Sequence, residues 1–223
     1  HGIEIQVVGD VVRRPGWTAR VTAAYNTLNN EVVHSGGSPV FGISGFSSST
    51  VQAVVQEGWP VGALRGTTST LNADGSIAST ERLQYLGKPL PDRFGSLGLQ
   101  LTFGSNLRLE AHADWQTGAQ LHSFNRQFRY LYGIGDPELP PALLAANPGP
   151  IRRNWLNLTN FFVEDTDYLR VRTISANYTL TQSALGRWAN NVELGLALQN
   201  PFGWWNSSFD PESDHSGAAS QGA

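Results

Sequence analysis

The chain has 223 residues, and its 15 Lys and Arg against 18 Asp and Glu give a formal net charge of −3. This balance is too mild for a nucleic-acid-binding surface, so we expect no nucleic-acid partner. The absence of Cys excludes a disulfide scaffold, a thiol nucleophile and a Cys-ligated metal site. Because the chain opens with His1 and contains no Met, we expect it to be an excerpt of a longer reading frame.

Alternation of polar and apolar residues predicts an all-β chain. Four hairpins are expected in chain order: residues 3–7 with 17–25, 51–56 with 60–68, 97–103 with 107–116, and 168–180 with 191–200. The helical period appears only in the short run PPALLAAN at residues 140–147. In the last hairpin Leu169 and Val171 occupy one face while Ile174 and Ala176 occupy the other, which predicts a β-bulge near Arg172.

The connections between these strands alternate between short and long. About residues 28–49, 69–93, 119–166 and 201–223 read as irregular stretches, whereas the turns within the hairpins are tight. Long loops at one end and short turns at the other are typical of an outer-membrane barrel, whereas a compact soluble domain seldom needs several loops of this length. Trp17 and Tyr25 lie about 26 Å apart along one strand, which suits the spacing of two interfacial aromatic girdles. The alternative is a secreted β-sandwich that binds carbohydrate on exposed aromatic rings.

Five sequence segments together resemble one family. The run FVEDTDYLRVRTISANYTL at residues 162–180 resembles the C-terminal signature of the SusC/RagA-like TonB-dependent outer-membrane receptors. Four more segments resemble further elements of that family and follow its order: GIEIQVVGDVVRRPGWTARVTAAYNTLNNEVV, EGWPVGALRG, LGKPLPDRFGSLGLQLTFGSNLRLEAHADWQTG and LALQNPFGWWNSSFDPE. The resemblance covers essentially the whole chain.

The resemblance implies a partial antiparallel transmembrane β-barrel of about eight strands, corresponding to strands 14 to 21 of a 22-strand barrel. Residues 1–223 would form the C-terminal portion of that barrel, without the plug domain and the last strand. Such a receptor lies in the bacterial outer membrane and imports glycans or peptides with energy supplied through TonB, which contacts the absent N-terminal region. A SusD-like surface lipoprotein is the implied partner, and outer-membrane lipid is the implied surroundings.

No pattern in the sequence points to an enzyme or to a cofactor. The five His residues lack metal-ligand spacing, and no nucleophile elbow or phosphate-binding loop is present. His112 lies on the polar face of its strand beside Glu110 and Asp114, which predicts a lumen-facing polar ladder.

Two weak candidate sites remain. In TLNADGSIASTE at residues 70–81, Asn72, Asp74 and Glu81 take positions 3, 5 and 12 of an EF-hand-type Ca²⁺ loop, but position 1 is Thr, and an exposed Asp-Gly turn is the ordinary interpretation. Trp204 and Trp205 follow an outward-running strand in a proposed extracellular loop. They are candidates for contact with ligand or with the partner lipoprotein, against simple packing within the loop.

Overall fold

The computed structural model describes residues 1–45, 51–135, 139–147, 149, 151–181 and 191–212. The chain is mostly antiparallel β-sheet and divides into two compact units. The first unit contains His1–Leu28, Asp92–Thr117 and Asp167–Trp205, and the second contains Asn29–Pro91, Gly118–Thr166 and the described part of Asn206–Ala223. The all-β fold predicted from the alternation is confirmed.

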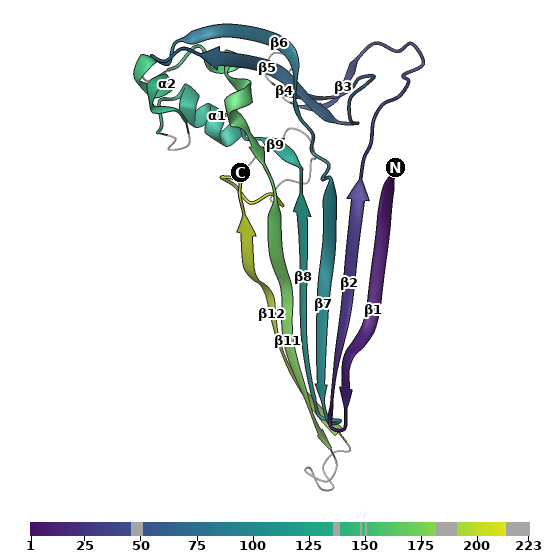
Figure 1. Cartoon of the computed structure of the whole chain (residues 1–223). Coiled ribbons are helices and arrows are strands. Elements are labelled where there is room, and N and C mark those ends of the chain that lie inside the picture. Colours follow the sequence, from purple (N-terminus) through teal and green to yellow (C-terminus); the bar gives the residue numbers. More distant parts are fainter. Residues whose placement is uncertain (46–50, 136–138, 148, 150, 182–190, 213–223) are drawn as a thin grey trace. The chain divides into compact units, whose positions relative to one another are not determined.

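The first unit is a six-stranded antiparallel sheet with the strand order β1-β2-β7-β8-β11-β12 (Figure 1). Its strands are β1 (Gly2–Arg14), β2 (Trp17–Leu28), β7 (Arg93–Phe103), β8 (Leu107–Thr117), β11 (Tyr168–Thr181) and β12 (Asn191–Trp205). Three of the predicted hairpins, β1-β2, β7-β8 and β11-β12, are therefore confirmed. The predicted turn between β11 and β12 falls on residues 182–190, outside the described part of the chain.

The remaining predicted hairpin forms in a different sheet. β4 (Val51–Val55) and β5 (Ala63–Leu71) lie between β3 (Phe41–Gly45) and β6 (Ile77–Gly87) in a four-stranded sheet of the second unit. The first sheet thus holds six of the eight strands expected for the barrel. Burial explains the difference, because the consecutive residues Ala53 and Val54 are both fully buried and β4 has no exposed apolar face.

Short helices complete the second unit, in which β9 (Gln120–His122) also pairs with β10 (Val163–Asp165). The helices are α1 (Phe124–Leu131), α2 (Pro141–Ala146) and the 3-10 helices η1 (Trp155–Asn157) and η2 (Thr159–Phe162). Helix α2 confirms the predicted helical run, whereas α1 occupies a stretch that the sequence predicted to be irregular. Ser123 caps α1, because its hydroxyl accepts a hydrogen bond from the Arg126 N–H at 3.3 Å.

Among the helices of the described residues, none combines the length and the apolar character that crossing a membrane would require.

The apolar core of the chain lies in the second unit. One cluster joins Val51, Ala53, Leu64 and Phe124, and the other joins Tyr130, Leu139, Leu143, Leu158 and Phe162. The first cluster packs residues of the 29–91 segment against Phe124 of the 118–166 segment, and the second cluster lies within the 118–166 segment. Both clusters are closely packed apolar interiors.

The bulge predicted in β11 is confirmed at Arg172. The register of β11 with both neighbours shifts between Val171 and Thr173, so the extra residue reverses the alternation. Leu169, Val171 and Ile174 consequently share one face of the sheet. Strand β12 also runs past its predicted end at Asn200, because Asn200 adopts a φ of 48° and pairing resumes at Phe202 opposite Val171.

Candidate functional site: the two faces of the six-stranded sheet

One face of the six-stranded sheet is apolar across its whole width. A row comprises the residues that pair side by side across all six strands. The three central rows are Val7, Ala23, Leu97, Ala113, Val171 and Phe202; Gly9, Val21, Leu99, Ala111, Ile174 and Leu198; and Val12, Ala19, Leu101, Leu109, Ala176 and Leu196. They contain no charged or polar side chain. Many of these side chains are nevertheless exposed, including Val7 at 59%, Leu97 at 53% and Leu196 at 69%.

Aromatic residues border the central rows at both ends. The loop-end belt, at the end of the strands where the long segments 29–91 and 118–166 begin, consists of Tyr25, Trp115 and Trp204. The ring centroids of Tyr25 and Trp115 are 5.9 Å apart, and Gly95 lies between the two residues in the row. A Cβ at Gly95 would lie 2.2 Å from the Ala24 backbone oxygen and 3.1 Å from the Trp115 ring, so the position requires glycine.

The turn-end belt lies at the opposite ends of the same strands and consists of Trp17, Phe103 and Tyr178. Trp17 stacks on Phe103 with ring centroids 6.1 Å apart. β2 runs without interruption from Trp17 to Tyr25, so the two belts are about 26 Å apart along the strands.

The opposite face is polar, and several of its charges neutralise one another. Asp10 is hydrogen-bonded by Arg13 and, at 2.8 Å, by Arg20. Asp114 accepts hydrogen bonds from Arg172 at 2.7 Å and from the Tyr168 hydroxyl at 3.2 Å. Both carboxylates therefore have cationic partners within the same sheet.

A recess of about 410 Å³ lies on this polar face. Gly98 has no side chain, and polar groups surround the space it leaves: Arg20, Thr22, Gln100, Glu110, His112 and Thr173. Within the sheet, His112 pairs with Gly98 on one side and Thr173 on the other, which confirms its predicted place on the polar face. The volume lies in the range of small-ligand sites, and the lining offers hydrogen bonds to a polar solute.

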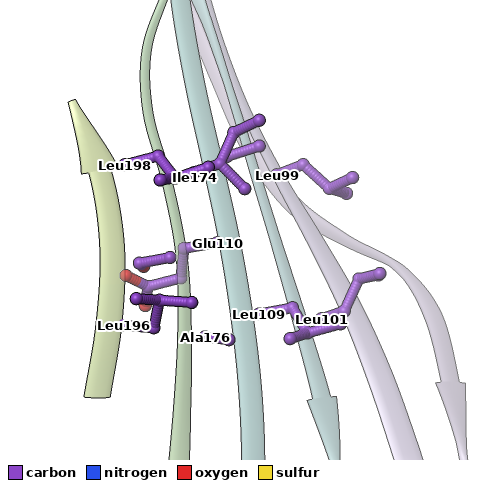
Figure 2. Close-up of a pocket in the computed structure, with 10 residues that line it drawn as sticks. Leu99, Leu101, Leu109, Glu110, Ile174, Ala176, Leu196 and Leu198 are labelled. Carbon is purple, nitrogen blue, oxygen red and sulfur yellow. The ribbon is translucent and has the colours of Figure 1, made fainter. Parts of the chain in front are cut away.

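A smaller groove of about 240 Å³ lies among the apolar side chains (Figure 2). Ala111 pairs between Leu99 and Ile174, and Ala176 pairs between Leu109 and Leu196. Each alanine is shorter than its neighbours, so the two positions form a depression within the central rows.

The structure separates the two predicted tryptophans. They are the last residues of β12, not part of a loop, and consecutive strand residues point to opposite faces. Trp204 lies on the apolar face, where its ring stacks on Phe202 at 6.3 Å. Trp205 lies on the polar face, with the Arg170 guanidinium 5.2 Å from the centre of its ring. The pair therefore does not form one binding platform.

The predicted Ca²⁺ ligands are not brought together either. Residues 72–76 form a tight turn between β5 and β6, in which Asp74 accepts hydrogen bonds from the Ser76 hydroxyl at 2.6 Å and the Ser76 N–H at 2.9 Å. These bonds hold the pKa of Asp74 below its ordinary value. Glu81 instead pairs with Thr68 within the sheet, about 13 Å along β6 from its first residue, Ile77. Within the described residues, no three His, Cys, Asp or Glu side chains are arranged to hold a metal ion.

Sequence reasoning missed one buried polar cluster in the second unit. His122 is fully buried, and its ring lies 4.5 Å from Phe124 and 6.5 Å from Phe162. Burial lowers the pKa of His122 to about 3, so this side chain is neutral at ordinary pH. Arg126, four residues after His122, forms a buried ion pair at 2.9 Å with Glu164 of the paired strand β10. Glu164 also accepts hydrogen bonds from Ser208, which ties the segment after β12 to this unit.

The same fold occurs in part of a solved peptide importer. Structures of the RagAB peptide importer in its open-open and closed-closed states match 99% of this chain with TM-scores of 0.69 and 0.64, both at 14% sequence identity. A structure of the RagAB peptide transporter matches it with a TM-score of 0.68 at 15% identity. The chain spans 27% of the length of each of these chains. No family model and no curated protein matches the sequence. At this identity the likeness shows the fold and nothing finer.

Proposed function

We propose that this chain is part of a TonB-energised nutrient-uptake receptor of the bacterial outer membrane, of the SusC/RagA kind. The observation that carries the proposal is the exposed apolar face of the six-stranded sheet, whose uncharged central rows lie between two aromatic belts. Such a band, flanked by aromatic residues, is the outer surface of a transmembrane β-barrel. The polar face then lines the interior, where its paired charges remain in water.

The energetics favour lipid as the medium around the apolar face. Burial of apolar surface contributes about 25 cal/mol per Å², so a face of exposed Leu, Val and Phe side chains is strongly stabilised by hydrocarbon. The belts lie about 26 Å apart along strands that would tilt by about 40°, which gives a height of about 20 Å. This height is close to the apolar band of about 25 Å in outer-membrane barrels.

The proposal assigns the loop end to the cell exterior. The long segments 29–91 and 118–166 both leave and re-enter the sheet at this end, and long connections in outer-membrane barrels are extracellular. The structural neighbours are described as a peptide importer, and we propose a peptide or a glycan as the imported solute. A SusD-like lipoprotein at the exterior and TonB at the periplasmic side complete the proposed assembly. Uptake of this kind needs no covalent chemistry and no cofactor.

A secreted β-sandwich explains the same observations less well. A sandwich buries one face of each sheet against the other, whereas Leu97 and Leu196 on the apolar face are 53% and 69% exposed. Its core also has no need of aromatic residues confined to the two ends of the strands.

Cysteine labelling of the intact receptor on whole cells tests the proposal. These 223 residues contain no Cys, so Val33→Cys and Ser105→Cys each introduce a single reporter into this part of the receptor. Val33 is 85% exposed in the 29–91 segment, and Ser105 lies in the β7-β8 turn. We expect an impermeant maleimide to label Val33→Cys on intact cells and Ser105→Cys only after the outer membrane is permeabilised. Equal labelling of both reporters on intact cells would overturn the topology, and recovery of the receptor in the soluble fraction would overturn the membrane location.

A further inference from the structure

A pocket of about 510 Å³ lies wholly within the 29–91 segment of the second unit. Residues 35–40, the end of β4 with the turn that follows it, and single positions of β5 and β6 form its walls. The volume falls in the range of small-molecule sites. Among the described residues that line it are one acidic and one basic side chain, Glu57 and Arg65, and no aromatic ring. The pocket therefore offers a ligand two opposite charges and no ring on which a sugar could stack.

The basic residue of this pocket has no acidic partner. Arg65 is half-buried on β5, and its guanidinium donates a hydrogen bond to the Gln52 side-chain oxygen at 3.2 Å. Within the part of the chain that the structure describes, no carboxylate pairs with it, whereas Arg20, Arg126 and Arg172 each have one. A guanidinium with spare N–H donors binds a carboxylate through two parallel hydrogen bonds. Arg65 is therefore suited to hold an anionic group of a ligand.

The acidic residue of the pocket has one oxygen to spare. Oε1 of Glu57 accepts hydrogen bonds from the Ser35 N–H at 2.6 Å and the Ser35 hydroxyl at 2.9 Å, and it lies 3.1 Å from Nδ1 of His34. No described residue donates a hydrogen bond to Oε2. The bonds from Ser35 lower the pKa of Glu57, so this carboxylate is ionised at neutral pH. Glu57 is therefore suited to accept hydrogen bonds from an ammonium group.

Leu83 adds an apolar side chain to the pocket from a β-bulge. The pairing of β5 with β6 shifts between Gly66 and Thr68, so that Arg82 and Leu83 together oppose Thr67. Leu83 has a φ of 59°, in the left-handed region that bulky residues rarely adopt, and it is 54% exposed. An exposed apolar side chain at a strained position of a pocket is a candidate for contact with a ligand.

The two charged residues are separated by the length of a short peptide. Arg65 pairs with Gln52 of β4. From Gln52 the strand continues for three residues to Val55, and Glu57 follows two residues later. Three to five residues of extended chain span about 10 to 16 Å. An extended peptide of about three to five residues therefore has the length to place one end at Arg65 and the other at Glu57.

We propose that this pocket binds short peptides by their two free termini, with the carboxylate on Arg65, the ammonium group on Glu57 and an apolar side chain against Leu83. The inference rests on the proposed function and deepens it, because it names the class of solute taken up. The proposed topology places the 29–91 segment outside the cell, where solutes reach the pocket. An inorganic anion satisfies Arg65 alone, and a neutral glycan satisfies neither charge, whereas a zwitterionic peptide satisfies all three side chains.

Isothermal titration calorimetry of the intact receptor in detergent with the tetrapeptide Ala-Leu-Leu-Ala tests the site. We expect amidation of the carboxylate or acetylation of the amino group to weaken binding about tenfold, because each removes a charge-assisted contact. Arg65→Gln should weaken binding of the free tetrapeptide about tenfold and make the receptor indifferent to amidation. Glu57→Gln should make it indifferent to acetylation, and its remaining oxygen still accepts the hydrogen bonds from Ser35.

Leu83→Gly tests the apolar contact in a variant that keeps the fold, because glycine adopts a φ of 59° without strain. We expect it to weaken binding of the tetrapeptide several-fold. Arg82→Gln is the matched control, since Arg82 is exposed beside Leu83 on β6 and does not line the pocket. Its affinity for the tetrapeptide should be unchanged.

The results separate the possible occupants. Equal affinity for the free and the blocked tetrapeptides would overturn recognition of the termini, and a preference for the free carboxylate that persists in Arg65→Gln would overturn its partner. Displacement of the tetrapeptide by millimolar phosphate would show a simple anion site and would also overturn the proposal. Binding of maltotetraose that is lost in Arg65→Gln would assign the pocket to a glycan. A receptor in the outer-membrane fraction that binds no tetrapeptide contradicts this inference alone, whereas a receptor in the soluble fraction contradicts the proposed function.

Discussion

Tyr130, Leu143 and Phe162 in the second unit are all 0% exposed, whereas Val7, Leu97 and Leu196 in the six-stranded sheet are 59%, 53% and 69% exposed. Among the described residues, Ala19 is the one buried apolar residue that belongs to the sheet. The two units therefore follow opposite rules for the placement of apolar side chains. A single chain can combine a unit that has a buried apolar core with a sheet that has an exposed apolar face when the connections at one end of the sheet fold among themselves.

Polar groups differ between the two units in the same way. The second unit pairs Arg126 with Glu164 in its interior, with both side chains 8% exposed. The sheet instead places its charged pairs on one face, where Arg20 is 53% exposed as it contacts Asp10. A buried ion pair is costly unless all its charged atoms have hydrogen-bond partners, whereas each exposed ion pair contributes little to stability.

The largest expected effect is on the 223-residue chain by itself in buffer. Within the described residues, β1 and β12 have a partner strand on one side only, so each presents an edge of unpaired N–H and C=O groups. The apolar face adds exposed hydrocarbon. We expect the chain to aggregate in buffer and to form no heat-modifiable, protease-resistant species in detergent, as followed by size-exclusion chromatography and gel mobility. A monodisperse monomer with cooperative thermal unfolding in plain buffer would contradict the comparison, because the sheet would then behave as the second unit does.

A smaller effect should distinguish the two faces of the sheet. Leu109→Arg places a charge in the central rows and should cost about 2 to 4 kcal/mol in the free energy of unfolding of the intact receptor from lipid. Glu110→Arg, its neighbour on the polar face, should cost less, because the new charge stays in water. A refolding titration in lipid vesicles measures both variants side by side. Equal losses would show that the two faces are not in different media.

The smallest expected effect concerns acid and the second unit. The pKa of His122 is about 3 in the folded chain, below its ordinary value of 6.5. Between these values the unfolded state binds a proton that the folded state does not bind, so stability falls as pH decreases below 6.5. The loss should reach about 2 to 3 kcal/mol at pH 4.5. Hydrogen exchange of the α1 amides in the intact protein, corrected for intrinsic rates, measures this loss.

His122→Leu should remove the acid sensitivity, because it removes the titrating group from the core. His34→Gln is the control, since the His34 side chain is 77% exposed in the same unit. An unchanged pH dependence in His122→Leu would assign the acid sensitivity to other groups.

The sequence by itself determined the strands of the sheet and which residues share a face. Alternation has a period of two, which local backbone geometry enforces, so Leu107–Thr117 and its partner could be assigned without coordinates. Even the bulge at Arg172 was visible, because one extra residue reverses the alternation.

Tertiary structure decided which sheet each strand joins and which distant residues come together, because alternation does not encode either. The hairpin of β4 and β5 joined the second unit, where Ala53 and Val54 are both buried and Ala53 packs in a cluster with the distant residue Phe124. The separation of Trp204 from Trp205, and of Glu81 from Asp74, also followed from pairing with other strands. Pairing joins residues far apart in the chain, and its energy depends on the packed surface that results. A local pattern therefore predicts a strand and its faces, and the assembled sheets decide which partners those faces meet.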